Sequence, residues 1–225
     1  GTHKKGVYLS SVWCFNPTKK IWHALPQMPA PMDHHSATLL PAGTCRPHDP
    51  ARVLMTNFRS EPYAPAVKKV YALDLHTERD GKITFPGSKK LNTWYEFSSD
   101  PEPRDGSGVV LSKDNRYLVS FGGKENSSHI DMDEPMRRIR VFDICNRNWH
   151  VSKMKLQTPR FAVVACRHSE RPMICGGTHI RANKKLIKAG IFNKLDENAN
   201  LDDCEVFDMK KVIDAALSQP IQQMP

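Results

Sequence analysis

The stretch Ile139-Arg140-Val141-Phe142-Asp143, with Trp149 six residues after the aspartate, decides the fold of this chain. Related five-residue cassettes, each ending in a large apolar residue followed by Asp or Asn, occur at Val12–Asn16, Val70–Asp74 and Cys204–Asp208. A pattern that recurs at long period indicates a repeated supersecondary unit. The cassettes therefore predict a repeat architecture.

Each repeat contains several short runs that are typical of strands. In one unit Arg104 precedes the run 108–111, and a second run ends at the glycine pair 122–123. The next unit repeats this order from Arg160 to the pair 176–177, so that the two glycine pairs lie 54 residues apart. Short runs rich in Val, Ile, Phe and Tyr, bounded by Gly, Pro and Asp, predict strands, and helical spacing is absent over most of the chain. We expect each unit to be a four-stranded blade that stacks on its neighbours.

The repeated residues have distinct expected roles. A glycine pair ends a strand where the backbone needs positive φ or where another segment approaches closely. An Asp or Asn after the cassette starts a tight turn, because its side chain bonds nearby amides. A tryptophan fills the gap between adjacent blades. The residues predicted to serve these structural roles are Gly122, Gly123, Gly176, Gly177, Asp74, Asp143, Asp208, Trp22, Trp94 and Trp149.

This order of motifs resembles that of the kelch-repeat β-propellers, the galactose oxidase and kelch-like type. The family pattern has an Arg-led strand, a second strand ending in Gly-Gly, a third ending in Asp, and a Trp about six residues later. The resemblance covers most of residues 7 to 208 and implies an all-β, kelch-type propeller. The chain departs from the pattern at Thr56-Asn57-Phe58, where Gly-Gly is expected, and at Asp33-His34-His35, where Arg is expected.

In the family's strand order the chain holds about three and a quarter four-stranded blades, fewer than the four to eight of a closed propeller. We therefore expect residues 1–225 to form a single, incomplete kelch propeller. Residues 7–58 hold a partial first blade and the start of the next, 67–123 and 139–177 hold blade strands, 178–203 form a long loop, and 204–225 a last strand or short helix and tail. Three explanations stay open: a fragment of a larger propeller, completion by another chain, or closure as a small, distorted propeller.

Composition indicates which partners and which compartment to expect. The net charge of +9, with a sequence pI near 9.3, favours acidic partners. No zinc finger, RNP-type strand or glycine-arginine tract supports nucleic-acid binding. The six cysteines form no C-x-x-C pair, and four of them lie in apolar runs, so we interpret them as reduced thiols of a cytoplasmic protein.

Catalytic motifs are absent from the sequence. It has no nucleophile elbow, P-loop or dinucleotide fingerprint, and we predict neither a cofactor nor a metal site. His34 and His35 are adjacent, so on a strand they point to opposite faces and do not readily share one ion. We predict no enzymatic activity. The resemblance leaves one alternative open, a propeller enzyme of the oxidase or sugar isomerase type whose active site is completed elsewhere.

Binding is expected on the loops that join second to third strands, at 57–69, 124–138 and 178–203, because loops longer than about 12 residues are usually functional or disordered. The candidate binding residues are Arg59, Arg104, Arg160, His179, Arg181, Lys184, Lys185 and Lys188. For Arg104 and Arg160, bracing of blade-to-blade packing is the competing interpretation. The sequence predicts a non-catalytic protein-interaction scaffold with protein partners, acidic ones favoured, and no membrane partner. Its resemblance implies roles such as substrate adaptor, cytoskeletal or structural component, and association with RNA through basic loops is a further alternative.

Overall fold

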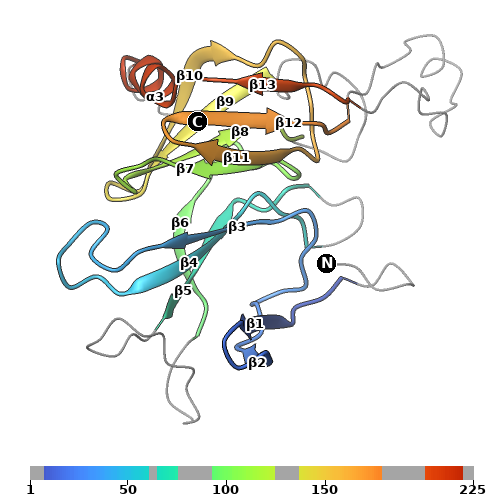
Figure 1. Ribbon diagram of the computed structural model, residues 1–225, viewed down its shortest axis with the longest axis vertical. Coiled ribbons are helices and arrows are strands. Elements are labelled where there is room, and N and C mark those ends of the chain that lie inside the picture. The colour runs from blue at the N-terminus through green and yellow to red at the C-terminus, as the bar shows by residue number, and fades with distance from the viewer. Residues whose placement is uncertain (1–7, 61–64, 76–92, 125–136, 179–200, 220–225) are drawn as a thin grey trace, which may run out of the picture.

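The computed structural model describes residues 8–60, 65–75, 93–124, 137–178 and 201–219, which form four antiparallel sheets (Figure 1). The amino-terminal hairpin consists of β1 (Val12–Asn16) and β2 (Ile21–Leu25). Blade one consists of β3 (Ser36–Leu40), β4 (Ala51–Thr56), β5 (Lys69–Leu75) and β6 (Tyr95–Ser99). Blade two consists of β7 (Gly108–Leu111), β8 (Tyr117–Phe121), β9 (Arg138–Asp143) and β10 (Asn148–Lys155). Blade three holds β11 (Val164–His168), β12 (Arg171–Cys175) and β13 (Cys204–Val206), followed by α3 (Met209–Leu217).

Both four-stranded sheets are simple meanders, since their strands pair in sequence order. The innermost strands β3, β7 and β11 contact one another in turn, which stacks the three blades side by side. The described sheets do not close into a ring. The predicted fold class, an all-β, kelch-type propeller that is incomplete, is confirmed.

Helix α3 follows β13 in chain order, where the other two blades have a fourth strand, and it packs on β10 and β9 of blade two. Asp208 caps it, because the Asp208 side chain accepts a hydrogen bond from the Lys211 amide at 3.1 Å. Met209, Val212 and Ala216 are buried on one face of the helix and join the core between blades two and three. The last segment is therefore both a strand and a helix, where the sequence left a choice between them.

Two of the three predicted tryptophans, Trp149 and Trp94, lie between sheets. Trp149 stacks on Phe142 with ring centroids 4.8 Å apart, in the core shared by blades one and two. Trp94 donates from its indole nitrogen to the Pro26 carbonyl at 3.0 Å and so ties blade one to the end of the hairpin. Trp22, at the equivalent position of the hairpin, is 63% exposed. It differs because no described blade precedes the hairpin.

The backbone repeats its conformation even where the sequence departs from the pattern. Asn57 takes the place of the first glycine of the pair, with φ of 56° against 65° at Gly122 and 62° at Gly176. Asparagine tolerates this left-handed conformation better than other residues with a side chain. The blade-one segment 56–58 therefore makes the same turn without glycine.

Four of the six cysteines are paired, which corrects the expectation of reduced thiols. Cys45 is bonded to Cys145 across blades one and two, with Cα atoms 5.2 Å apart. Cys175 is bonded to Cys204, its partner in register on the neighbouring strand. The repeat brings these residues together from positions 100 and 29 residues apart, a proximity that spacing alone does not show. No helix among the described residues is both long and apolar enough to span a membrane.

Candidate functional site

Polar residues converge at one end of the innermost strand pairs, where the second-to-third loops begin. In each blade the pairing of the first two strands is extended there by a single bridge: Asp33 with Arg59, Asp105 with Lys124, and Phe161 with Thr178. These three bridges are equivalent, because each joins the residue before a positive-φ residue to the start of a loop. We call the residues Tyr8, Asp33, His34, Arg59, Asp105 and Lys124 the inner cluster.

Arg59 lies at the centre of the inner cluster. Its guanidinium is 2.9 Å from His34 Nδ1, and its Nε lies 3.4 Å from Asp105 Oδ2. Asp33 Oδ2 is 3.9 Å away from the same guanidinium. The blade-one carboxylate and the blade-two carboxylate thus face one arginine, which fixes the relative position of the two blades at this end.

One contact in the inner cluster has two incompatible requirements. His34 Nδ1 must be unprotonated to accept from Arg59, yet it must carry a proton to donate to Asp105 Oδ2, 3.3 Å away. A single ring nitrogen cannot do both at once. Arg59 Nε and Asp105 Oδ2 are buried, and neither has a hydrogen-bond partner among the described residues. These two atoms are instead paired as ions, with Nε and Oδ2 3.4 Å apart.

Lys124 lies at the edge of the inner cluster that is next to blade three. Its ammonium lies 4.7 Å from the centre of the Phe161 ring, a cation–π contact, and the side chain is buried. Burial lowers the pKa of Lys124, and Asp105 opposes this change. At Tyr8, burial raises the pKa of the phenol. The cluster therefore contains two groups with shifted pKa values, Tyr8 and Lys124, from different parts of the chain.

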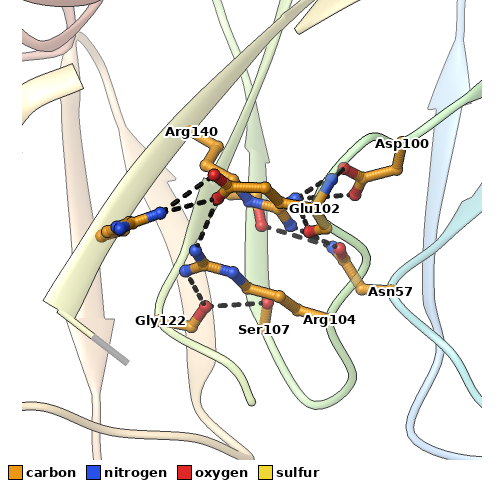
Figure 2. Close-up of polar contacts among 9 residues, drawn as sticks. Asn57, Asp100, Glu102, Arg104, Ser107, Gly122 and Arg140 are labelled. Atoms are coloured by element: carbon orange, nitrogen blue, oxygen red, sulfur yellow. Dashed lines mark hydrogen bonds and ion pairs between the residues drawn. The ribbon is translucent and has the colours of Figure 1, made fainter. Parts of the chain in front are cut away.

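A second polar network lies between blades one and two (Figure 2). The guanidinium of Arg140 donates to both carboxylate oxygens of Asp100 at 2.7 Å and to the Asn57 side chain at 3.2 Å. Arg104 donates to Glu102 at 3.1 Å and reaches the Gly122 carbonyl at 3.5 Å. Burial, and then the neighbouring charge of Arg140, lower the pKa of Arg104 to about 9. Arg104 thus stays protonated at neutral pH, held by acids that offset the repulsion between the two arginines.

Arg160 has the equivalent position in blade three and a simpler environment. Its guanidinium donates to the Gly176 carbonyl at 3.1 Å and to Glu205 at 2.9 Å. The carboxylate of Glu205 also accepts from the amides of Gln157 and Thr158. Arg160 therefore joins the start of β11 to the glycine turn and to β13.

These positions decide where the sequence-based candidates can act. Arg104 and Arg160 are 2% and 0% exposed, so their side chains brace the blades and do not reach the loop surface. Arg59 lies in the inner cluster at the start of a loop. The predicted candidates His179, Arg181, Lys184, Lys185 and Lys188 lie outside the described residues.

Sequence reasoning missed several of the residues that organise these sites. It singled out neither Asp105 and Lys124 of the inner cluster nor Arg140 and Glu205 of the networks. Arg140 and Glu205 both stand at the second position of the cassette, so a charge inside an apolar strand run was the available signal. In blade one the fully buried Met32 precedes the bridge residue, where the other blades have arginine, whereas the sequence aligned the missing arginine with 33–35. No group of three or more potential metal ligands was found within the described ranges.

Comparison with known proteins supports the propeller fold. A family model for the kelch motif matches residues 1–29, which include the amino-terminal hairpin. The chain is similar to the solved structure of YjhT, a kelch-type propeller protein, with a TM-score of 0.51 and 15% sequence identity. That similarity covers 87% of this chain and 48% of the YjhT chain, so the chain spans about half of the length of this neighbour. A search of curated proteins finds no significant match. The predicted resemblance to kelch-repeat propellers is confirmed.

Proposed function

We propose that the chain is a non-catalytic protein-interaction module that holds an acidic segment of a partner protein on its loop-bearing face. The observation that carries the proposal is the position of Arg59, next to His34 and Lys124, where the second-to-third loops of blades one and two begin. Arginine presents a planar fork that suits carboxylates. A chain with a net charge of +9 also attracts acidic segments from a distance.

The unused hydrogen-bonding capacity of the inner cluster fits a peptide. Arg59 Nε and Asp105 Oδ2 face each other as an ion pair at 3.4 Å, but neither atom makes a hydrogen bond within the described part of the chain. An acidic peptide offers a side-chain carboxylate to the first and a backbone N–H to the second. Such a ligand would add hydrogen bonds to both members of this ion pair, whereas a ligand with acceptors alone would add one to Arg59 only.

The proposal can be tested with a fluorescent glutamate-rich peptide, whose binding is followed by anisotropy. We expect Arg59→Ala to weaken binding at least about tenfold, since one charge-assisted bond is worth roughly 1.5–3 kcal/mol. Lys153→Ala is the matched control, because it removes one exposed positive charge from β10, away from the inner cluster. Equal effects of the two substitutions contradict the proposed site.

The same assay distinguishes the binding of an acidic protein segment from the binding of RNA. A single-stranded RNA of the same charge is titrated at 50 and 200 mM salt. Tighter binding of the RNA than of the peptide, with a steep fall in affinity as salt rises, overturns the acidic-protein proposal.

A second candidate function is catalysis by a propeller enzyme of the oxidase or sugar isomerase type. The shifted pKa values of Tyr8 and Lys124, close to His34, favour it, because ionisable groups with altered pKa values often serve as acids and bases. A panel of sugars and sugar acids followed by NMR tests it. Turnover that His34→Gln abolishes supports the enzyme, and unchanged substrates with intact peptide binding support the scaffold.

The predicted cytoplasmic location remains a proposal. Disulfides persist in oxidising compartments and are rare in the cytosol, so the Cys45–Cys145 and Cys175–Cys204 pairs weigh against it.

A further inference from the structure

A cavity lies between blades one and two, at the opposite end of the strands from the inner cluster. The inner cluster flanks the start of β3 and the end of β4. The cavity lies beside the loop 41–50, which joins the end of β3 to the start of β4, and beside the turn 144–147 between β9 and β10. Its volume is about 270 Å³, and every residue that lines it belongs to the described part of the chain. It is therefore a separate site.

Positive charge dominates the lining of this cavity. Arg46 comes from the loop of blade one, Arg52 from β4, and Arg147 from the turn of blade two. Asp49 is the single acidic residue among the described residues of the lining, and its Oδ2 accepts from the Arg46 amide at 3.0 Å. Three guanidinium groups from three separate segments thus face a space that holds one carboxylate.

The charge of these arginines is only partly neutralised. Arg52 Nε lies 3.1 Å from Asp74 Oδ1, an ion pair beside the cavity. The Arg46 and Arg147 side chains make no ion pair and no hydrogen bond with the residues that the structure describes. Each guanidinium carries five N–H donors. The cavity therefore offers hydrogen-bond donors and positive charge to a ligand.

A buried aromatic ring holds two of the arginines next to each other. The guanidinium carbon of Arg147 lies 4.5 Å from the centre of the Phe97 ring, and that of Arg52 lies 5.4 Å from it. Phe97 is 4% exposed and belongs to the core between blades one and two. Two like charges on one fixed ring repel each other, and an anion bound beside them offsets that repulsion.

Two further groups prepare the cavity for an anion. The Cys45–Cys145 disulfide joins the loop next to Arg46 to the turn that carries Arg147, so both arms of the site are fastened together. Holding a site in its bound arrangement reduces the entropy that binding costs. Burial, and then the hydrogen bond from its hydroxyl to Asp74, raise the pKa of Tyr95 to about 12. Tyr95 therefore adds no negative charge to the lining at neutral pH.

We propose that this cavity binds a small tetrahedral oxyanion, either free phosphate or the phosphate group of a small monoester. Arginine pairs with phosphate through two parallel N–H bonds, and three arginines on separate segments suit a group whose oxygens point in several directions. A volume of about 270 Å³ lies just below the range of pockets for drug-sized ligands, which fits a single phosphate group on a small molecule. The inference is independent of the proposed binding of acidic segments.

The test is isothermal titration calorimetry of the whole chain with inorganic phosphate in a chloride buffer. We expect one ion to bind per chain, with a dissociation constant between about 10 µM and 1 mM. Arg46→Gln and Arg147→Gln each remove one guanidinium and should raise the dissociation constant at least about tenfold. Arg171→Gln is the matched control, because it makes the same change at an exposed arginine of β12 in blade three, and it should leave the constant within about twofold.

Two other ligands sharpen the test. Acetate, a planar anion with fewer oxygens, should bind at least about fivefold more weakly than phosphate. Glycerol 2-phosphate distinguishes the source of the group: binding at least as tight as that of phosphate supports a monoester, and weaker binding supports the free ion. Circular dichroism of each variant confirms that its sheets are folded.

Three results overturn the proposal. One is the absence of phosphate binding up to about 5 mM. Another is an equal effect of the three arginine substitutions, which would show that phosphate responds only to the overall charge of the chain. The third is acetate binding as tight as that of phosphate.

Discussion

The pairs Phe142–Trp149 and Phe15–Trp22 have the same sequence spacing, the same register and nearly the same ring separation, yet only the first is covered. Phe142 is completely buried, whereas Phe15 is 45% exposed. The cassette therefore builds its aromatic pair from local sequence, by cross-strand pairing on one face of a hairpin. The neighbouring blade, and not the cassette, decides how much apolar surface the pair removes from water.

The residues next to the two pairs reflect this difference. Arg140, at the second position of the blade-two cassette, lies with its guanidinium 4.9 Å from the centre of the Trp149 ring and is bonded to Asp100 of blade one. Trp13 has this position in the hairpin. A buried charge is tolerable in blade two because blade one supplies its partner. At the uncovered hairpin the same position is apolar, which suits a surface that another sheet covers.

The largest expected effect comes from breaking the Arg140 contact. Arg140→Met should lower the free energy of unfolding by about 3–5 kcal/mol, because it leaves the carboxylate of Asp100 buried without its ion-pair partner. Urea unfolding followed by circular dichroism measures this change. Adding Asp100→Asn to the variant should recover part of the loss, and a double variant less stable than Arg140→Met would contradict the assignment.

The second largest loss of stability is expected from removal of Trp149, the covered tryptophan. Trp149→Ala takes a stacked ring out of the core between blades one and two and should cost about 3 kcal/mol. The same unfolding experiment tests it. A cost below about 1 kcal/mol would show that the core between the two blades does not depend on this ring.

The turn after each cassette provides a smaller and pH-dependent effect. Burial raises the pKa of Asp143, but bonds from the Asn146 amide and from Arg116 outweigh it and leave the pKa lowered. The stability from this lowered pKa is present above about pH 3.8, the ordinary value, and is lost as pH falls through the folded-state value. Asp143→Asn should cost about 1–2 kcal/mol at neutral pH and flatten this acid slope. Unfolding at pH 7 and pH 3 measures both, and an unchanged slope in Asp143→Asn would contradict the account. The hairpin has Asn16 at this position, which accepts from the Lys19 amide at 3.0 Å without any such slope.

The smallest effect is expected at the exposed pair. Trp22→Ala should change the free energy of unfolding by less than about 0.5 kcal/mol when the chain is dilute enough to be monomeric. Urea midpoints at two protein concentrations test this expectation. A large loss of stability in the monomer would mean that another part of the chain covers Trp22.

The sequence predicts the repeated elements well, because each depends on local chemistry. Asp143 accepts from the amides of Cys145 and Asn146, as expected for a turn-starting aspartate. Glycine at the positive-φ position of Gly122 and Gly176 follows from backbone sterics in the same way.

Contacts between blades could not be predicted from one sequence. Arg140 and Asp100 are 40 residues apart, and Cys45 and Cys145 are 100 apart, so only the stacked blades show which residues meet. The inner cluster could not be predicted for the same reason, since Arg59 and Asp105 come from different blades. The sequence pointed to Arg59 as a loop arginine but gave no sign of the Asp105 carboxylate that faces it.

The central claim is that the neighbouring blade, and not the cassette itself, decides whether the aromatic pair is covered. Acrylamide quenching of single-tryptophan variants tests it most directly: one variant keeps Trp149 and the other keeps Trp22, with the remaining tryptophans changed to phenylalanine. In the folded chain at low concentration we predict that Trp22 is quenched several-fold more strongly than Trp149. Equal protection of the two residues in the monomer would contradict the account.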